Sequence, residues 1–160
     1  MSKKLVAYFS AGGVTAAVAK KLSEVASADL YEIKPETLYT EADLDWRDKQ
    51  SRSSVEMQDP SSRPPIGSNK ADIEAYDVIF LGYPIWWYVA PRIINTFLES
   101  YNFSGKIIVP FATSGSSGMG DSAEKLESSL SSGAVWKSGK LLNGNPSAEV
   151  LAVWVESLNL

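Results

Sequence analysis

The sequence predicts an α/β fold in which helices cover both faces of a parallel sheet. Short apolar runs typical of buried strands alternate along the chain with segments of helical periodicity. The strand-like runs are residues 4–9, 29–33, 77–83 and 106–112, followed by a less clear fifth in residues 134–136 and 140–142. Their order, β-α-β-long insert-β-α-β-α-β-α, is typical of one parallel sheet. We see no internal repeat and expect residues 1–160 to form a single domain.

Apolar residues at helical spacing follow four of these strands. The first such segment covers about residues 14–25, and the second covers about residues 91–101, where Pro91 suits the first helical turn. A third helix is expected through Leu126 and Leu130. A fourth begins after Ser147, whose hydroxyl can cap its N-terminus.

Residues 34–75 form a long polar insert between the second and third strands. An unstructured connection of this length is uncommon, and the insert contains aromatic residues such as Tyr39 and Trp46. We therefore expect an ordered, packed segment with short helices. Three arginines in the insert could either face a ligand or make surface ion pairs, and an ion pair is the simpler expectation for each alone: Arg47, Arg52 and Arg63.

The composition excludes several kinds of active site. The 160 residues include no cysteine and no histidine, which excludes disulfides, thiolate metal sites, a cysteine nucleophile and a Ser-His-Asp hydrolase. Chemistry must then come from carboxylates, lysine, tyrosine or a cofactor that brings its own reactivity. A formal net charge of −4 argues against nucleic acid as the main partner.

No segment has the length of a signal-peptide core or of a membrane span. The apolar residues 5–9 end at Ser10-Ala-Gly-Gly13 and are too short for a signal peptide. No run approaches the roughly 20 apolar residues that cross a bilayer. We expect a cytoplasmic protein that does not bind membranes.

Three turns that follow strands carry the residues best suited to hold a ligand. They are residues 10–15, 84–88 and 113–118. In a parallel sheet covered by helices, such turns share the carboxyl edge, where ligands bind at the point at which the strand order reverses. Three turns of this kind on one edge indicate a binding site.

The first turn could hold a phosphate group. It presents backbone N–H groups and the hydroxyls of Ser10 and Thr15 at the start of a helix, where free amide donors and the helix dipole favour an anion. It has neither the lysine of a Walker loop nor the spacing of a dinucleotide-binding glycine motif. Alone, the turn could equally be no more than a tight connection.

The second and third turns suit a planar ligand. Tyr83-Pro-Ile-Trp-Trp-Tyr88 has two adjacent tryptophans, which cannot both point into one core. We therefore expect at least one ring to face the carboxyl edge, with packing against the insert as the alternative. The small, hydrogen-bonding residues of Thr113-Ser-Gly-Ser-Ser-Gly118 could contact the polar edge of a heteroaromatic ring or form a flexible surface loop.

Several stretches spread over nearly the whole chain carry a family resemblance. They are residues 5–10, 39–44, 51–52, 59–64, 81–87, 95–98 and 110–115. The run Leu81-Gly-Tyr-Pro-Ile-Trp-Trp87 is the most specific of them. On these residues the sequence resembles the flavodoxin family, and closely a short bacterial branch of flavodoxin-like proteins.

The resemblance implies a fold, a cofactor and a set of contacts. The fold is a doubly wound five-stranded parallel sheet of order 2-1-3-4-5, with the insert between strands 2 and 3, and the cofactor is noncovalent FMN. The residues expected around the FMN phosphate are Ser10, Gly12, Gly13, Val14 and Thr15. Those expected around its ring are Pro84, Ile85, Trp86, Trp87, Thr113, Ser114, Gly115 and Gly118. We expect neither a catalytic side chain nor a metal ligand.

Gly12 and Val14 depart from the pattern that the resemblance implies, because this branch usually has threonines there. Backbone N–H donors survive both changes, but two hydroxyls are lost. We expect phosphate binding to be retained and weakened by up to about tenfold per group, since a neutral hydrogen bond contributes about 0.5–1.5 kcal/mol. Arg52 and Arg63 lie in matching stretches and are the better candidates for ligand contact.

The sequence favours an electron carrier that shuttles electrons between redox partner proteins, a reductase or an oxidase. The alternative is an NAD(P)H-dependent quinone or nitro-compound reductase, in which the insert would wall a pocket beside the flavin. The sequence has no recognisable nicotinamide-binding motif, which favours the carrier without deciding whether the chain is an enzyme. A domain that no longer binds flavin is a third alternative, motivated by Gly12 and Val14.

Overall fold

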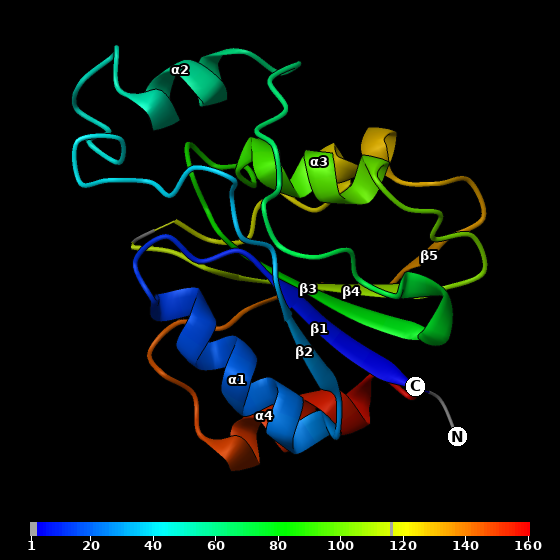
Figure 1. Ribbon diagram of the computed structural model, residues 1–160. Helices are drawn as coiled ribbons and strands as arrows, with labels where there is room; N and C mark the ends of the chain where they lie inside the picture. The colour runs from blue at the N-terminus through cyan, green and yellow to red at the C-terminus, as the bar shows by residue number, and fades with distance from the viewer. Residues whose placement is uncertain (1–2, 116) are drawn as a thin grey trace.

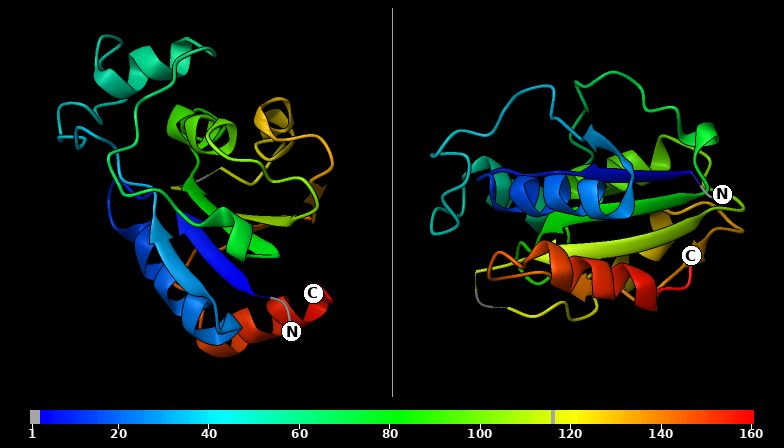
Figure 2. Two further views of the ribbon diagram at one scale, coloured as in Figure 1. Left: turned by 45° about the vertical axis from the view of Figure 1, so that its right-hand side comes forward. Right: turned by 90° about the horizontal axis from the view of Figure 1, so that it is seen from below.

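The computed structural model describes residues 3–115 and 117–160. Helices cover both faces of a central sheet (Figure 1). On one face lie α1 (Val14–Ala26) and α4 (Ala148–Ser157), and on the other lie α3 (Arg92–Glu99) and a short 3-10 helix, η2 (Glu124–Ser129). Figure 2 shows the same layers from two other directions. This arrangement confirms the α/β fold that the sequence predicts.

The sheet is parallel throughout and has the predicted strand order. Its strands are β1 (Lys4–Tyr8), β2 (Asp29–Glu32), β3 (Val78–Pro84), β4 (Ile107–Thr113), β5 (Val135–Trp136) and β6 (Lys140–Leu141). They are ordered β2-β1-β3-β4-β5, and β6 also pairs with β4. The order 2-1-3-4-5 places the reversal of strand order between β1 and β3, where the chain goes first to β2 on one side and later to β4 on the other.

The fifth position of the sheet is split into two short strands, where the sequence predicted one. Ile108 of β4 pairs with Trp136 of β5, and Phe111 of β4 pairs with Lys140 of β6. From one pair to the next the chain therefore advances three residues along β4 and four residues along the adjoining segment. The mismatch lies opposite Pro110, which has no N–H to donate and so favours a break or bulge in the adjoining strand.

Two predicted helices differ from the observed ones. α3 begins at Arg92 and ends at Glu99, so Pro91 is its N-cap residue rather than part of its first turn. The helix expected through Leu126 and Leu130 is only the 3-10 helix η2. Serines explain this difference, because their hydroxyls compete for local hydrogen bonds and do not favour helix interiors. The Ser147 cap is confirmed, since Val150 N–H donates to Ser147 Oγ at 3.2 Å.

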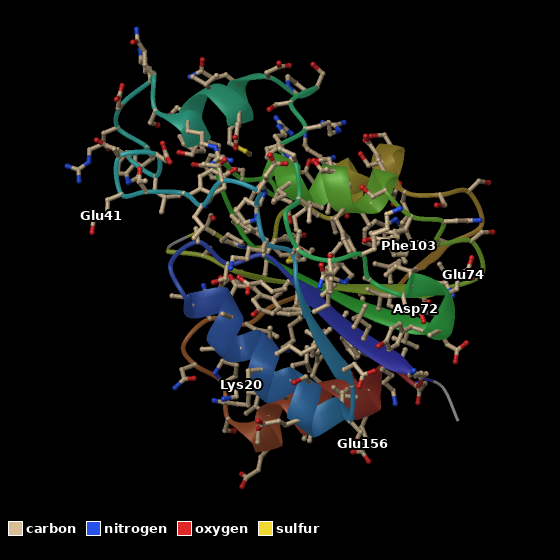
Figure 3. The ribbon with its side chains drawn as sticks, in the orientation of Figure 1. Lys20, Glu41, Asp72, Glu74, Phe103 and Glu156 are labelled. Carbon is tan, nitrogen blue, oxygen red and sulfur yellow. The ribbon has the colours of Figure 1, made fainter. Side chains whose placement is uncertain are left out.

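Alternate residues of the central strands bury opposite faces of the sheet, as the pleat requires. Ile79 and Leu81 of β3 belong to the core under α3, whereas Phe80 belongs to the core under α1 and α4. Gly82 is required by this packing, because a Cβ there would lie 2.2 Å from the Phe111 ring. Charged side chains such as Lys20 and Glu156 point outward from the helical layer (Figure 3).

The insert is ordered and contains the expected short helices, α2 (Arg52–Gln58) and the 3-10 helix η1 (Ile73–Ala75). An antiparallel bridge between Pro35 and Ile66 closes its base. Figure 1 shows the part with α2 projecting on the side of the molecule where β1 and β3 end. Within residues 3–115 and 117–160, no helix has the length and apolarity that a membrane span requires.

Candidate functional site

The three turns singled out in the sequence meet at the carboxyl edge and are tied together by hydrogen bonds. Ile85 N–H, in the second turn, donates to the Thr113 carbonyl at 2.8 Å. The Thr15 and Thr113 hydroxyls, which are buried, lie 2.8 Å apart and join the first turn to the third. The turns therefore form one connected cradle at the end of the sheet.

A pocket of about 360 Å³ lies in this cradle, within the range of roughly 300–1,000 Å³ that is usual for small-molecule sites. The predicted residues that line it are Ser10, Gly12, Val14, Thr15, Pro84, Ile85, Trp86, Trp87, Thr113, Ser114 and Gly115. Gly13 and Gly118 were also predicted to bind the ligand, but neither is among the lining residues. Ser116 of the third turn lies outside the described residues.

In the first turn, Gly13 shapes the start of α1 rather than lining the pocket. Its φ of 93° lies in the left-handed region that favours glycine. Its N–H donates to Ser10 Oγ at 3.1 Å, inside the turn. No side chain of the described residues caps α1, so the N–H groups of its first turn, beginning at Val14, have no intrahelical partner. They are available to an anion.

The second turn is a tight reversal with unusual residues at its centre. Trp86 and Val89 exchange backbone hydrogen bonds of 2.8 and 3.1 Å. Between them, Trp87 has a φ of 49° and Tyr88 a φ of 70°. Positive φ at both central positions is the type I′ pattern, which normally takes asparagine and glycine. Two bulky aromatic residues there carry backbone strain, and such strain is concentrated at functional sites.

The two adjacent tryptophans have different surroundings. Trp86 makes edge contacts with Phe9 and Tyr39, at ring-centroid distances of 5.6 and 5.5 Å. Because Tyr39 belongs to the insert, Trp86 packs against the insert, as the alternative interpretation of the sequence expected. Trp87 is 44% exposed, and both tryptophans are among the residues that line the pocket. Trp86 and Trp87 thus form an aromatic wall of the pocket, in which Trp87 is the more exposed residue.

The third turn is held by bonds of its own. Ser114 N–H donates to Asn143 Oδ1 at 2.7 Å, and the Asn143 amide donates to Ser114 Oγ at 3.2 Å. The Ser114 hydroxyl also donates to the Ser117 carbonyl. Because these groups already have partners, Ser114 contributes mainly to the shape of the pocket.

Four residues that line the pocket were missed in the sequence: Ala11, Leu44, Trp46 and Ser53. Ala11 lies within the first turn itself. Leu44, Trp46 and Ser53 come from the insert, and we call them the insert wall. An aromatic residue in a polar segment was a signal for Trp46, but no pattern in the sequence distinguished Ser53 from its neighbours.

The insert arginines do not line the pocket. Arg52 Nε lies 3.0 Å from Glu56 Oε2, and its guanidinium lies 3.8 Å from the centre of the Tyr39 ring. The Tyr39 hydroxyl donates to Glu56, and burial, followed by this bond, raises the pKa of Tyr39. The preference for Arg52 as a ligand contact is therefore not supported, because Arg52 does not line the pocket and its Nε and Nη1 already have partners within the insert.

Arg63 also binds within the protein. Its Nε donates to Glu99 Oε1 of α3 at 2.9 Å, and this bond holds the pKa of Glu99 below its usual value. Arg47 lies over the Trp46 ring, 5.5 Å from its centre. In the described chain, none of the residues that line the pocket is charged. The pocket therefore selects a ligand through backbone amides, hydroxyls and aromatic surface.

Comparison with known proteins agrees with this geometry. The flavodoxin family model matches residues 3–158. A flavoprotein candidate from Bacteroides eggerthii DSM 20697 is 52% identical, with 100% of this chain and 99% of that chain covered and a TM-score of 0.94. Another from Bacteroides uniformis ATCC 8492 is 51% identical, with 97% and 98% covered and a TM-score of 0.91.

More distant structures share the fold. A Lactobacillus acidophilus NCFM flavoprotein, solved in complex with FMN, is 21% identical over 100% of both chains, with a TM-score of 0.72. No curated protein matches the sequence. Because the family model covers nearly the whole chain, this protein belongs to the flavodoxin family.

Proposed function

We propose that the chain binds FMN noncovalently in the carboxyl-edge pocket and carries electrons between redox partner proteins. The observation that supports this best is the pairing of two features in one uncharged pocket. One is the start of α1, which no described side chain caps, and the other is the aromatic wall of Trp86 and Trp87. A phosphate requires the first feature and a planar ring system the second.

Different residues of the pocket would contact the phosphate and the ring of FMN. The phosphate would be held by the first amides of α1 together with Ser10, whose hydroxyl accepts from Gly13 and still has a proton to donate. Thr15 and Thr113 share a hydrogen bond, so they position the turns before they contact any ligand. The ring would lie against the tryptophans and the third turn. Bound FMN would supply reversible electron transfer, which no side chain of this chain provides.

An FMN titration followed by fluorescence quenching tests the binding. We expect saturation at one FMN per chain. Riboflavin is the matched control, because it has the same ring without the phosphate and should bind more weakly if the start of α1 contributes. No binding at millimolar FMN would refute the proposal.

The lack of charge among the described lining residues should affect the redox potential of bound FMN. Reduction adds negative charge to the cofactor, and no cationic side chain compensates for it among the described residues that line the pocket. We therefore expect full reduction to occur at a lower potential than in free FMN. A redox titration measures this directly, and a potential equal to or above that of free FMN would contradict the reasoning.

The partner is expected to be a protein with a basic docking face. The chain has a net charge of −4, and complementary charge accelerates the encounter of redox proteins. A cytoplasmic location stays a prediction of the sequence.

The insert wall favours a second candidate, an NAD(P)H-dependent reductase of quinones or nitro compounds. Leu44, Trp46 and Ser53 give the pocket a side that the sheet edge alone does not provide. Consumption of NADPH with a quinone, in the presence of FMN and without an added reductase, would favour this enzyme. Electron transfer only when a reductase is added would favour the carrier.

A further inference from the structure

One buried serine that lines the pocket has a hydroxyl without a hydrogen-bond partner among the described residues. Ser53 is 2% exposed and lines the pocket. Within residues 3–115 and 117–160, its Oγ makes no hydrogen bond. A buried polar group without a partner is unfavourable, so this hydroxyl requires an explanation.

Helix capping does not provide that explanation. Ser51 and Ser54, on either side of Ser53, already use their hydroxyls at the start of α2. Ser51 Oγ accepts from Ser54 N–H at 3.4 Å and donates to Ser54 Oγ at 2.9 Å. Ser53 N–H donates to the Asp43 carbonyl at 3.0 Å, so its backbone amide has a partner, while its hydroxyl has none among the described residues.

The segment that carries Ser53 is held in place from both sides. Arg92 of α3 donates to the Met57 carbonyl of α2 at 2.9 Å. Glu56 of α2 binds Arg52 and accepts from Tyr39, whose ring contacts Trp86. These contacts fix α2 relative to the aromatic wall. Ser53 is therefore held in a fixed position in the pocket lining, which lowers the entropic cost of using it to bind a ligand.

The surroundings of Ser53 define the group that it would bind. Its companions in the insert wall are the apolar Leu44 and the aromatic Trp46, and none of the described residues that line the pocket is charged. Placing an anion beside these residues would cost much free energy, because nothing there replaces its hydration. Placing a neutral ring oxygen there costs much less. A serine hydroxyl has one proton to donate to such an oxygen.

We propose that Ser53 is a ligand-binding residue whose hydroxyl donates to a ring carbonyl oxygen of a planar aromatic ligand. The inference rests on the proposed function and adds the insert to the binding machinery. The carbonyl belongs either to the ring of FMN or to a second ligand such as a quinone. Ser53 thus gives the insert a role in recognition besides its role as a wall.

The test is Ser53→Ala, with two readouts: ligand affinity should fall while the stability of the unliganded protein should not. In the unliganded protein, the melting temperature should stay the same or rise, because an unpaired buried hydroxyl is removed. Ligand binding should weaken by about 2- to 10-fold, as expected for one lost hydrogen bond. The probes are FMN added to the unliganded chain and 1,4-naphthoquinone added to the chain with and without FMN.

Ser61→Ala is the matched control in the same insert, because the Ser61 hydroxyl is exposed and donates to Asp59 at 2.7 Å. It should leave binding of both probes unchanged. Weaker FMN binding by Ser53→Ala assigns the carbonyl to the flavin, and weaker naphthoquinone binding alone assigns it to a second ligand. Either result supports the proposal.

The proposal is overturned if Ser53→Ala binds both probes as tightly as the unmodified chain does, or if the unmodified chain binds neither. The first result would leave FMN binding by the unmodified chain intact. That binding, measured alone, decides the proposed function, so the two ideas can fail separately.

Discussion

The strained turn at Trp87 and Tyr88 allows a sharp test of the structure. Tyr88 has a φ of 70° and is 75% exposed, so its backbone is strained while its ring buries little surface. We compare Tyr88→Gly with Tyr88→Ala. Both remove the ring, but only glycine adopts a positive φ without a steric penalty.

The expected difference follows from two opposing terms. A residue with a Cβ in the left-handed region costs about 1–2 kcal/mol. Glycine costs about 0.5–1 kcal/mol more than alanine in backbone entropy. Tyr88→Gly should therefore be more stable than Tyr88→Ala by about 0.5–1 kcal/mol. For a chain of this size that corresponds to a melting temperature roughly 1–4 °C higher.

Thermal unfolding of the two unliganded variants, followed by circular dichroism, measures this difference. The same pair at Val153 is the control, because Val153 is 68% exposed and lies within α4. There alanine should be the more stable by about 1 kcal/mol. If glycine were no better than alanine at position 88, the left-handed turn would be absent in solution and the argument from strain would fail.

Three further predictions concern the pocket, the core and the response to acid. Val14→Thr should tighten FMN binding by about 2- to 10-fold, because it adds a hydroxyl at the exposed start of α1. The control Val153→Thr should leave FMN binding unchanged. Equal FMN affinities of Val14→Thr and the unmodified chain in a fluorescence titration would contradict this prediction. Gly82→Ala should lower the free energy of unfolding by about 1–3 kcal/mol, measured in urea, because the new Cβ would lie 2.2 Å from an aromatic ring of β4. The Arg63 bond lowers the pKa of Glu99 in the folded state, so its contribution to stability is present above the ordinary value of 4.5 and is lost as pH falls through the lower folded value. Glu99→Gln should therefore reduce stability at pH 7 more than at pH 3, and an equal reduction at both would show that the charge of Glu99 contributes nothing to stability.

The parts of the site that could be predicted from the sequence are those fixed by strand ends. A parallel strand places the turn after it at the carboxyl edge whatever the turn contains. The position of Trp86 and Thr113 in one cradle therefore followed from recognising β3 and β4 as strands. The family resemblance, most specific at residues 81–87, added the identity of the ligand and its expected contacts with these turns.

The insert wall could not be predicted in the same way, because nothing in the sequence fixes where a long loop returns to the body. Ser53 reaches the pocket because distant parts of the chain hold α2 in place, among them Arg92, about forty residues further along the chain, which binds the end of α2. The split of the fifth strand was missed for a related reason. It depends on Pro110, which lies in the neighbouring strand and not in the split segment itself.

The pocket and the outer surface differ in charge, so they suit different kinds of partner: a neutral ligand in the pocket and a charged protein on the surface. The arginines of the insert lie in contacts inside the protein, and no described lining residue is charged. Labelled charges such as Glu41 and Glu156 point away from the body (Figure 3). Added salt should therefore slow association with a basic partner protein, which depends on long-range charge. It should have little effect on the binding of a neutral ligand such as naphthoquinone, which depends on contacts at the insert wall and the tryptophans. A quinone affinity that fell steeply with added salt would contradict this reasoning, because a neutral ligand held by apolar and aromatic contacts has no charge to screen.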